Sequence, residues 1–364
     1  MKQAPQRMLL PSHRAAGEAL GALAWVGQRR VSLPENYLTL SREERLAPLG
    51  VAATQSGRPV RLLEKDIWVV WALDGLSRSQ FGEHLVLWGG TSLSKGYNII
   101  RRSSNDVDVM YDIRQLLPDL AGDDPIPKTN SQADKWVREI TEKRAVFIEK
   151  ALSIIKKHIE TTSVRAIATA VFQKIYVDYD PLAKGTGHVE PSVIIDFRVH
   201  GAGEPWEKRT ITCDAAAHLP NLRFPSATLK TLLPKRTFWD KATAIHDYCV
   251  RRKAEDRYSR HWHDLMRLDA VGCANAAFED PGLAKSVAAF KARFFRAKDS
   301  ACNPIDYDKA LSGNLKLVPD GEALEALEAD YKKMADEGIL LDDAEPFSKL
   351  IECCADIEQR ANSR

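Results

Sequence analysis

The sequence predicts an α+β fold in which a small mixed sheet with helices precedes a mostly helical C-terminal part. Short apolar and alternating segments, which are typical of strands, occur before residue 200. From Thr237 onward, the apolar residues recur mainly at helical spacing. A length of 364 residues favours two domains. We expect an N-terminal helical extension at 1–60, a core at 61–210, and a helical domain at 211–364 that completes the functional site.

The first elements are predicted to be helices. One is expected around Ala15–Gln28, and a short one near Ser41, where two glutamates occupy the first turn. A helix is predicted at Glu64–Ser77, because the apolar residues of this segment cover much of a helix circumference. The apolar segment His84–Trp88 then predicts a buried strand, and Thr91–Tyr97 the helix that follows it.

Further strands and helices alternate along the rest of the chain. Asp106–Ile113 alternates between apolar and acidic residues, which indicates a strand with one face toward the core. A long helix is expected at Gln132–Ile159, and two strands at Ala170–Tyr179 and Ser192–His200. Amphipathic helices are expected at Glu322–Asp336 and Pro346–Arg360.

A glycine pair and a hydroxyl pair lie between the first predicted strand and its helix. These residues are Gly89, Gly90, Thr91 and Ser92. The free N–H groups of a helix N-terminus would point at this loop and can bind phosphate. Alternatively, the glycines only make a tight turn and one hydroxyl caps the helix. Lys95, one turn into the helix, either reaches a phosphate or is solvated.

Three aspartates form a candidate metal site. Strand alternation places Asp106 and Asp108 on one face, opposite Val107 and Val109. Two like charges repel, and a divalent cation relieves that repulsion. Asp196 interrupts an apolar strand, where an acid is costly unless it is paired or metal-bound. Together the three carboxylates can organise Mg²⁺ ions for phosphoryl displacement.

Lys241 is a second candidate, in a predicted helix rich in aromatic residues. A buried amine needs an anionic partner, and a triphosphate would serve. The alternative is a surface lysine whose aliphatic stem alone is buried.

Charge is unevenly distributed along the chain. Residues 319–364 carry 13 acidic and 5 basic side chains, whereas residues 1–318 carry 37 and 47. The basic body is compatible with a nucleic-acid partner but supports it only weakly. The six cysteines contain no Cys-x-x-Cys pair, and no apolar run is long enough to span a bilayer. We therefore expect reduced thiols, a cytoplasmic location and no membrane partner.

These motifs together resemble the AbiEii-type nucleotidyltransferase toxins of type IV toxin–antitoxin and phage-abortive systems. The resemblance begins at Leu63-Glu64-Lys65-Asp66, includes Gly89–Gly96 and Asp106-x-Asp108, and continues through 236–241 and 257–265 to the C-terminal tail. It implies a DNA polymerase β-like nucleotidyltransferase core. By motif, Gly89–Ser92 would contact phosphate, Asp106 and Asp108 would bind metal, Lys241 would contact the nucleotide, and Asp264 would be the last catalytic acid. Asp196 matches the third carboxylate of the wider superfamily.

One departure from the family pattern adjoins the metal site. Ser103-Ser104-Asn105-Asp106 stands where such proteins usually have Arg-x-Ser-Glu-Asp, so Asn105 replaces an acid.

The resemblance implies an enzyme that uses Mg²⁺ to transfer a nucleoside monophosphate from an NTP to an acceptor and releases pyrophosphate. RNA, in particular the tRNA 3′ end, is the expected acceptor, and an antitoxin protein is an expected partner. Such an enzyme would inhibit growth within a toxin–antitoxin or phage-defence system. Two alternatives stay open: transfer to a protein or to a small molecule such as an aminoglycoside, and a catalytically silent nucleic-acid-binding or partner-binding protein of the same fold.

Overall fold

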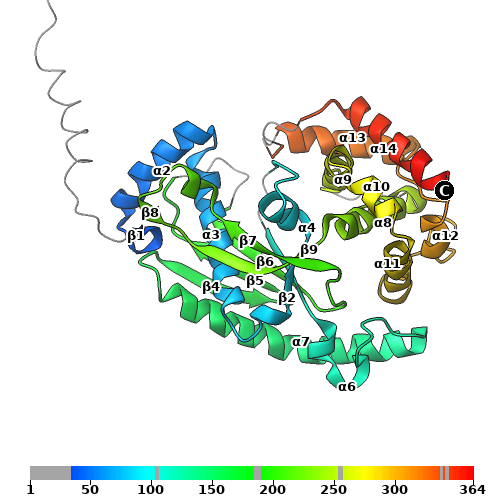
Figure 1. Ribbon diagram of the computed structural model, residues 1–364, viewed down its shortest axis with the longest axis horizontal. Helices are drawn as coiled ribbons and strands as arrows, with labels where there is room; N and C mark the ends of the chain where they lie inside the picture. Colours follow the sequence, from blue (N-terminus) through cyan, green and yellow to red (C-terminus); the bar gives the residue numbers. More distant parts are fainter. Residues whose placement is uncertain (1–33, 103–105, 184–189, 253–256, 337–338, 341–343) are drawn as a thin grey trace, which may run out of the picture.

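The computed structural model describes residues 34–102, 106–183, 190–252, 257–336, 339–340 and 344–364. The helix predicted at Ala15–Gln28 and the substitution at Asn105 lie outside these residues. Figure 1 shows two halves of the molecule: one is a sheet with the helices that pack on it, and the other is a group of helices beside it. The predicted α+β fold, a mixed sheet with helices plus a mostly helical C-terminal part, is confirmed.

The larger sheet has seven strands in the order β4-β5-β6-β3-β2-β9-β7. These strands are β2 (Leu85–Leu87), β3 (Asp106–Tyr111), β4 (Ala166–Val171), β5 (Lys174–Tyr179), β6 (Ser192–Arg198), β7 (Trp206–Thr212) and β9 (Ser226–Leu232). The pairs β3–β6 and β2–β9 are parallel, and the other pairs are antiparallel. A separate two-residue pair joins β1 (Glu35–Asn36) to β8 (Leu222–Arg223). The central position of β3 places its aspartates in the middle of the sheet.

Helices α3 (Val60–Ser77) and α7 (Asn130–Ile159) pack against one face of the sheet. Their apolar residues form the main core together with β-strand residues such as Val107, Val109 and Ile195. Helix α2 (Arg42–Ser56) lies against α3 and begins with a reciprocal cap between Ser41 and Glu44. The helices predicted near Ser41 and at Glu64–Ser77 are therefore present, the second with one more turn at its start.

The helical half follows the last sheet strand. It contains α8 (Pro234–Arg251), α9 (Arg260–Ala270), α10 (Cys273–Phe278), α11 (Pro281–Phe294), α12 (Tyr307–Leu311), α13 (Gly321–Asp336) and α14 (Phe347–Asn362). These helices share a second apolar core, to which Leu93, Ile99 and Ile100 also belong. The chain after the glycine pair therefore packs into the helical half before it returns to the sheet as β3.

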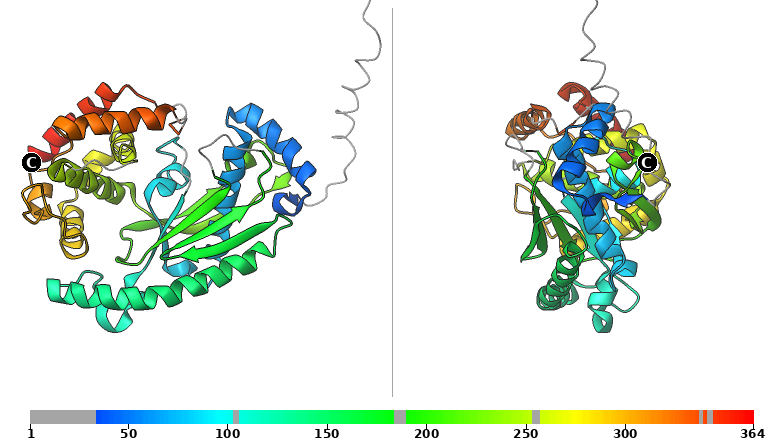
Figure 2. Two further views of the ribbon diagram at one scale, coloured as in Figure 1. Left: turned by 180° about the vertical axis from the view of Figure 1, so that it is seen from behind. Right: turned by 90° about the vertical axis from the view of Figure 1, so that its left-hand side faces the viewer.

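Helix α7 also connects the two halves. In Figure 2 it extends along the sheet and reaches beneath the helical half. The Arg293 guanidinium donates hydrogen bonds to the Pro127 and Lys128 carbonyls and to Asn130 at the start of α7. Nearby, Arg296 forms an ion pair with Asp134. These contacts tie the two halves together on the side away from α2.

Two predictions about the sheet require correction. The segment predicted as one strand at Ala170–Tyr179 is a hairpin of β4 and β5, because the chain reverses at Phe172, which has a φ of 54°. No glycine marks this reversal, so the apolar sequence looks continuous. The sheet also continues through β7 and β9, so the boundary expected at residue 210 falls inside β7 and the helical half begins at Pro234.

Two shorter elements, α5 (Ile113–Leu116) and α6 (Pro118–Ala121), connect β3 to α7. Ile113, expected to end the strand, begins α5 instead. The six cysteines are free thiols. Among the helices of the described residues, none has the length and apolarity needed to cross a lipid bilayer.

Candidate active site

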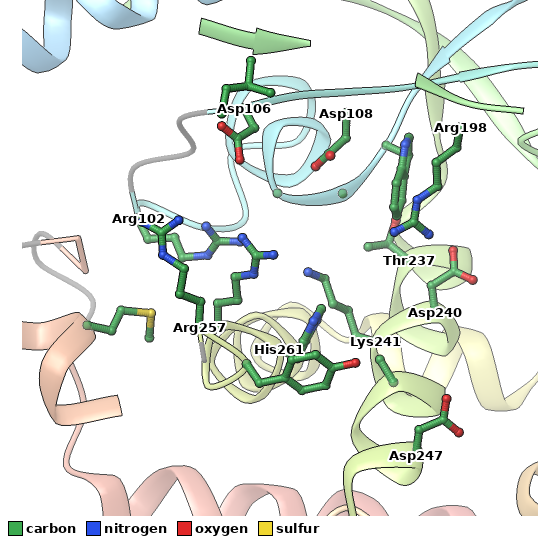
Figure 3. Close-up of a pocket in the computed structure, with 18 of the residues that line it drawn as sticks. Arg102, Asp106, Asp108, Arg198, Thr237, Asp240, Lys241, Asp247, Arg257 and His261 are labelled. Atoms are coloured by element: carbon green, nitrogen blue, oxygen red, sulfur yellow. The ribbon is translucent and has the colours of Figure 1, made fainter. Parts of the chain in front are cut away.

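A cavity of about 970 Å³ lies between the sheet and the helical half. Its sheet wall includes Gly89, Gly90, Asp106 and Asp108, and its helical wall includes Lys241. Five predicted site residues therefore line one cavity although they are separated by up to about 150 positions in the sequence. Figure 3 shows the two aspartates and Lys241 pointing into this space from opposite walls.

The strand alternation predicted for β3 is observed. Val107 and Val109 are fully buried in the core, while Asp106 and Asp108 face the cavity. Burial raises the pKa of Asp108, with smaller contributions from Asp106 and Asp196, whereas Arg198 lowers it. Among the described residues, neither Asp106 nor Asp108 has a hydrogen-bonded or ion-paired partner for its carboxylate. These two groups are suited to a cation.

Gly89 lies directly against Asp108. Its φ is +71°, and a Cβ atom added there would lie 2.6 Å from Asp108 Oδ2. Only glycine fits this position, because any side chain would strain the backbone and displace the carboxylate. The glycine therefore keeps the carboxylate beside the start of α4 (Gly89–Thr91).

The two hydroxyls of the predicted phosphate loop are fully buried. Thr91 Oγ1 donates to the Asp106 carbonyl, and Ser92 Oγ donates to the Gly89 carbonyl at 2.8 Å. The first of these bonds ties the loop to the beginning of β3. Neither hydroxyl lines the cavity, so their contribution to the site is to hold the backbone of the loop.

Lys95 lies outside the cavity. It belongs to the π-helical turn η3 (Ser92–Gly96), and its ammonium forms ion pairs of 2.6 Å with Asp66 and with Asp214. Burial by itself lowers the pKa of Lys95, but the two carboxylates more than compensate and raise it. The structure therefore satisfies this amine within the protein and does not bring it to the other predicted nucleotide contacts.

Lys241 and Asp264 form part of a buried charge cluster with Arg102. Asp264 is fully buried and forms two hydrogen bonds with Arg102, at 2.7 and 2.8 Å. Its Oδ2 atom is also 2.8 Å from Lys241 Nζ. Although burial opposes ionisation, Arg102 and Lys241 hold the pKa of Asp264 well below its usual range. Asp264 does not line the cavity; it holds the two cations that do.

One stripe of α8 faces the cavity. Thr237, Asp240, Lys241, Ala244 and Asp247 recur every three or four residues and line it. The opposite side of the helix buries Phe238, Trp239, Ala242 and Ile245 in the helical core. This amphipathic pattern explains why Lys241 lies in the wall, because its aromatic neighbours anchor the other side of the helix.

Several functional candidates were not predicted from the sequence. Arg102 is not among the predicted site residues, yet it is buried beside Asp264. Arg198 lies on the cavity face of β6 with its guanidinium 3.9 Å from the centre of the Trp88 ring. Burial lowers the pKa of His261 well below its usual value, so this wall residue is neutral. Arg198 could have been found from the alternation of β6, which places it on the face of Asp196.

Asp196 lies beside the aspartate pair. It is the register partner of Asp108 in the parallel β3–β6 pair, so the two side chains share a face. Its Oδ2 atom is 3.3 Å from Lys174 Nζ, and its Oδ1 atom is buried without a hydrogen-bond partner among the described residues. Within these residues, no three Asp, Glu, His or Cys side chains already form a metal-binding cluster.

The residues nevertheless fit a divalent cation. Mg²⁺ usually takes one or two carboxylates, and substrate phosphates and water complete its coordination. Asp106 and Asp108 supply such a pair. Asp196 does not line the cavity, but its orphaned oxygen is a third acceptor on the same face of the sheet. Cations dominate the lining as a whole: among the described residues it contains eleven Lys or Arg residues against seven Asp or Glu residues, the aspartate pair included. The cavity is therefore suited to a polyanion that arrives with its metal.

The match to a family model agrees with this chemistry. The family model of the nucleotidyl transferase AbiEii toxin, type IV TA system, matches residues 71–353. Among solved structures, the chain is similar to MenT4, a nucleotidyltransferase toxin from Mycobacterium tuberculosis H37Rv, at 16% identity and a TM-score of 0.34. That match covers 87% of this chain and 99% of the other. No curated protein matches the chain. Because the family model spans most of the sequence, this chain belongs to the AbiEii family of nucleotidyltransferase toxins.

Proposed function

We propose that this enzyme transfers a nucleoside monophosphate from an NTP to the 3′ end of an RNA, with tRNA as the best candidate, and that it uses Mg²⁺. The observation that carries the proposal is the Asp106–Asp108 face, whose carboxylates have no partner in the part of the chain that the structure describes, opposite the cations Lys241 and Arg102. A metal-bound triphosphate needs both: carboxylates for the metal and cations for the phosphate oxygens. The basic lining also suits an RNA acceptor.

The charge balance around Asp264 explains how Lys241 would act. Arg102 and Lys241 both pair with the carboxylate of Asp264, and both line the cavity. Burial lowers the pKa of Lys241, and Arg102 lowers it further, although Asp264 opposes both. An incoming phosphate would favour the charged form of Lys241. Asp264 thus acts in the proposal as a positioning residue for both cations, not as a proton acceptor.

In the proposed reaction, a hydroxyl oxygen of the acceptor attacks the α-phosphorus and forms a new P–O bond. The bond between the α-phosphorus and the bridging oxygen of the β-phosphate breaks, and pyrophosphate leaves with that electron pair. A bound Mg²⁺ would neutralise phosphate charge as it develops. The backbone at Gly89 and Gly90 lies beside Asp108, where it would contact the phosphates of the NTP. The hydroxyl proton passes to a carboxylate of this face or to water.

Growth inhibition follows in this proposal from modification of the acceptor, and a cognate antitoxin would counteract it. The family supports an antitoxin partner and an NTP substrate in general terms. The acceptor, the base preference and the location in the cell belong to the proposal.

Labelling with radioactive NTPs, Mg²⁺ and total tRNA tests the proposal. We expect labelled tRNA and released pyrophosphate with the wild type, and none with Asp108→Ala. Asp119→Asn is the matched control, since Asp119 is exposed on α6 and does not line the cavity. Equal labelling by Asp108→Ala would refute the assigned site. Labelling only of a protein or a small molecule would refute the RNA acceptor.

A further inference from the structure

One face of the sheet is open beyond the catalytic aspartates. In β4, Ile167, Thr169 and Val171 are exposed, while Ala168 between them is buried. The face that contains Ala168 packs against α7. In the part of the chain that the structure describes, no helix covers the other face at β4 and β5.

The strand register connects this open face to the active site. From the centre of the sheet to its edge, one row contains Asp106, Ile194, Tyr176 and Thr169. The next row contains Asp108, Asp196, Lys174 and Val171. Side chains in register share a face. The surface that presents the catalytic aspartates therefore continues without interruption to the sheet edge.

The outer part of this face is unusually apolar for a surface. Ile167 is 56% exposed and Val171 is 50% exposed, and Phe172 at the hairpin turn is 91% exposed. Clustered exposed apolar side chains mark interaction sites more often than scattered ones do. Tyr176 lies between this cluster and Asp106, and it lines the cavity.

The opposite wall of the cavity supplies positive charge. Arg257 precedes α9, and Lys333 lies near the end of α13; both line the cavity together with Met334 and Ile339. A chain lying on the open face would therefore have a flat aromatic and apolar surface on one side and cations on the other. A single-stranded polynucleotide needs this combination, since its bases stack on apolar faces and its phosphates pair with Lys and Arg.

We propose that the open face of β4, β5 and β6 holds a single-stranded RNA acceptor, with Tyr176 stacking on a base close to the reactive end. This inference rests on the proposed function and deepens it by placing the acceptor. Continuity with the aspartates favours RNA over a protein partner at this face. The reacting end of an acceptor must reach Asp106 and Asp108, and Tyr176 lies one register position beyond Ile194 on that path.

The first test replaces the stacking ring. Tyr176→Ala should raise the KM for a short single-stranded RNA with a free 3′ hydroxyl at least about fivefold, because the base loses its stacking partner. Tyr176→Phe keeps the ring and should keep the wild-type KM. The dissociation constant of the Mg²⁺–NTP complex, measured by calorimetry, should be unchanged in both variants. An unchanged acceptor KM in Tyr176→Ala would overturn the inference.

The second test uses a matched pair at the surface. Val171 and Val51 are each 50% exposed, but Val171 lies on the open face of β4, whereas Val51 lies on α2. Val171→Ser should raise the acceptor KM a few-fold, and Val51→Ser should not. An RNA with 4-thiouridine near its 3′ end should cross-link to the β4–β5 hairpin, and mapping of the cross-link elsewhere would overturn the placement.

The outcomes separate the two proposals. If the wild type labels no RNA, the proposed function fails. If the wild type labels RNA and the Tyr176→Ala and Val171→Ser variants do so with unchanged KM, only the placement of the acceptor fails. If Val171→Ser weakens binding of a purified antitoxin but leaves the acceptor KM unchanged, the face is a protein interface and the inference is refuted.

Discussion

The sheet half and the helical half each bury a lysine against carboxylates, but the two lysines differ in the number of acids that they contact. Lys95 on the sheet side pairs with both Asp66 and Asp214, and Asp214 in turn pairs with Arg58. Lys241 on the helical side shares one carboxylate, Asp264, with Arg102. The first cluster is neutral and lies away from the cavity. The second borders the cavity, which Lys241 and Arg102 both line.

The pKa values reflect this difference. Burial tends to lower the pKa of each lysine. For Lys95, two acids outweigh burial and raise the pKa. For Lys241, burial and the positive charge of Arg102 together keep the pKa lowered. A lysine held between two acids is compensated within the fold, whereas one that faces a neighbouring cation across a shared acid is suited to bind an anion. The comparison shows that burial of an amine does not by itself indicate function; the number of partner charges does.

The largest expected effect concerns stability. Lys95→Met leaves Asp66 buried without its cation, so we expect a loss of about 3–5 kcal/mol in the free energy of unfolding. Urea denaturation measures this loss. The double variant Lys95→Met with Asp66→Leu removes both charges and should recover part of it. A loss below about 1 kcal/mol would mean that Lys95 is not a structural residue.

Lys241→Met should act mainly on catalysis. Asp264 keeps its bidentate partner Arg102, so the fold retains a compensated acid, but the cation for the triphosphate is lost. We expect kcat for pyrophosphate release to fall about 10²–10³-fold, as for loss of other transition-state contacts. Lys241→Arg should retain more activity. If Lys95→Met instead lowered kcat but left the free energy of unfolding unchanged, the functional contrast between the two lysines would be refuted.

Glu64 in the sheet half and Asp264 in the helical half should make the free energy of unfolding depend on pH in different ways. Burial raises the pKa of Glu64, which accepts hydrogen bonds from the Leu182 N–H, to about 7. Because this folded-state value exceeds the unfolded one, its stabilising effect is complete below about pH 4.5 and is lost as pH rises through 7. The loss is about 3 kcal/mol. Glu64→Gln should flatten the unfolding free energy between pH 5 and 8, and an unchanged slope would contradict this.

The contribution of Asp264 to stability has a pH dependence of the opposite sign. Its pKa is depressed in the folded protein, so its contribution is present above about pH 4 and is lost only as the pH falls below that. It should therefore add no slope between pH 5 and 8.

The smallest expected effect on stability concerns Gly89. Gly89→Ala should cost about 1–2 kcal/mol because of its positive φ, and the displaced Asp108 should lower kcat about tenfold. Gly57→Ala is the control, since Gly57 has the same φ of +71° but open space around its Cβ position. Both variants should lose similar stability, and only Gly89→Ala should lose activity. Equal activity in both would mean that the contact with Asp108 is unimportant.

Much of the local structure could be predicted from residue patterns. The alternation around Asp106 and Asp108 and the periodicity of Glu64–Ser77 correspond to β3 and α3. The hairpin at Phe172 was missed because its turn contains no glycine, asparagine or proline. Strands β7 and β9 lie in polar or mixed sequence, where alternation is weak. Edge and parallel pairings depend on distant partners, which a local pattern does not report.

The sequence by itself determined which residues alternate in β3, which of its faces is apolar, and where a glycine pair adjoins them. Those features follow from chain geometry over a few residues. Only the tertiary structure decided that Lys95 pairs with Asp66 while Lys241 borders the cavity, and that Arg102 holds Asp264 across 162 positions. The reason is physical: the state of a buried charge depends on every charge within a few ångströms, and folding brings those charges from distant segments.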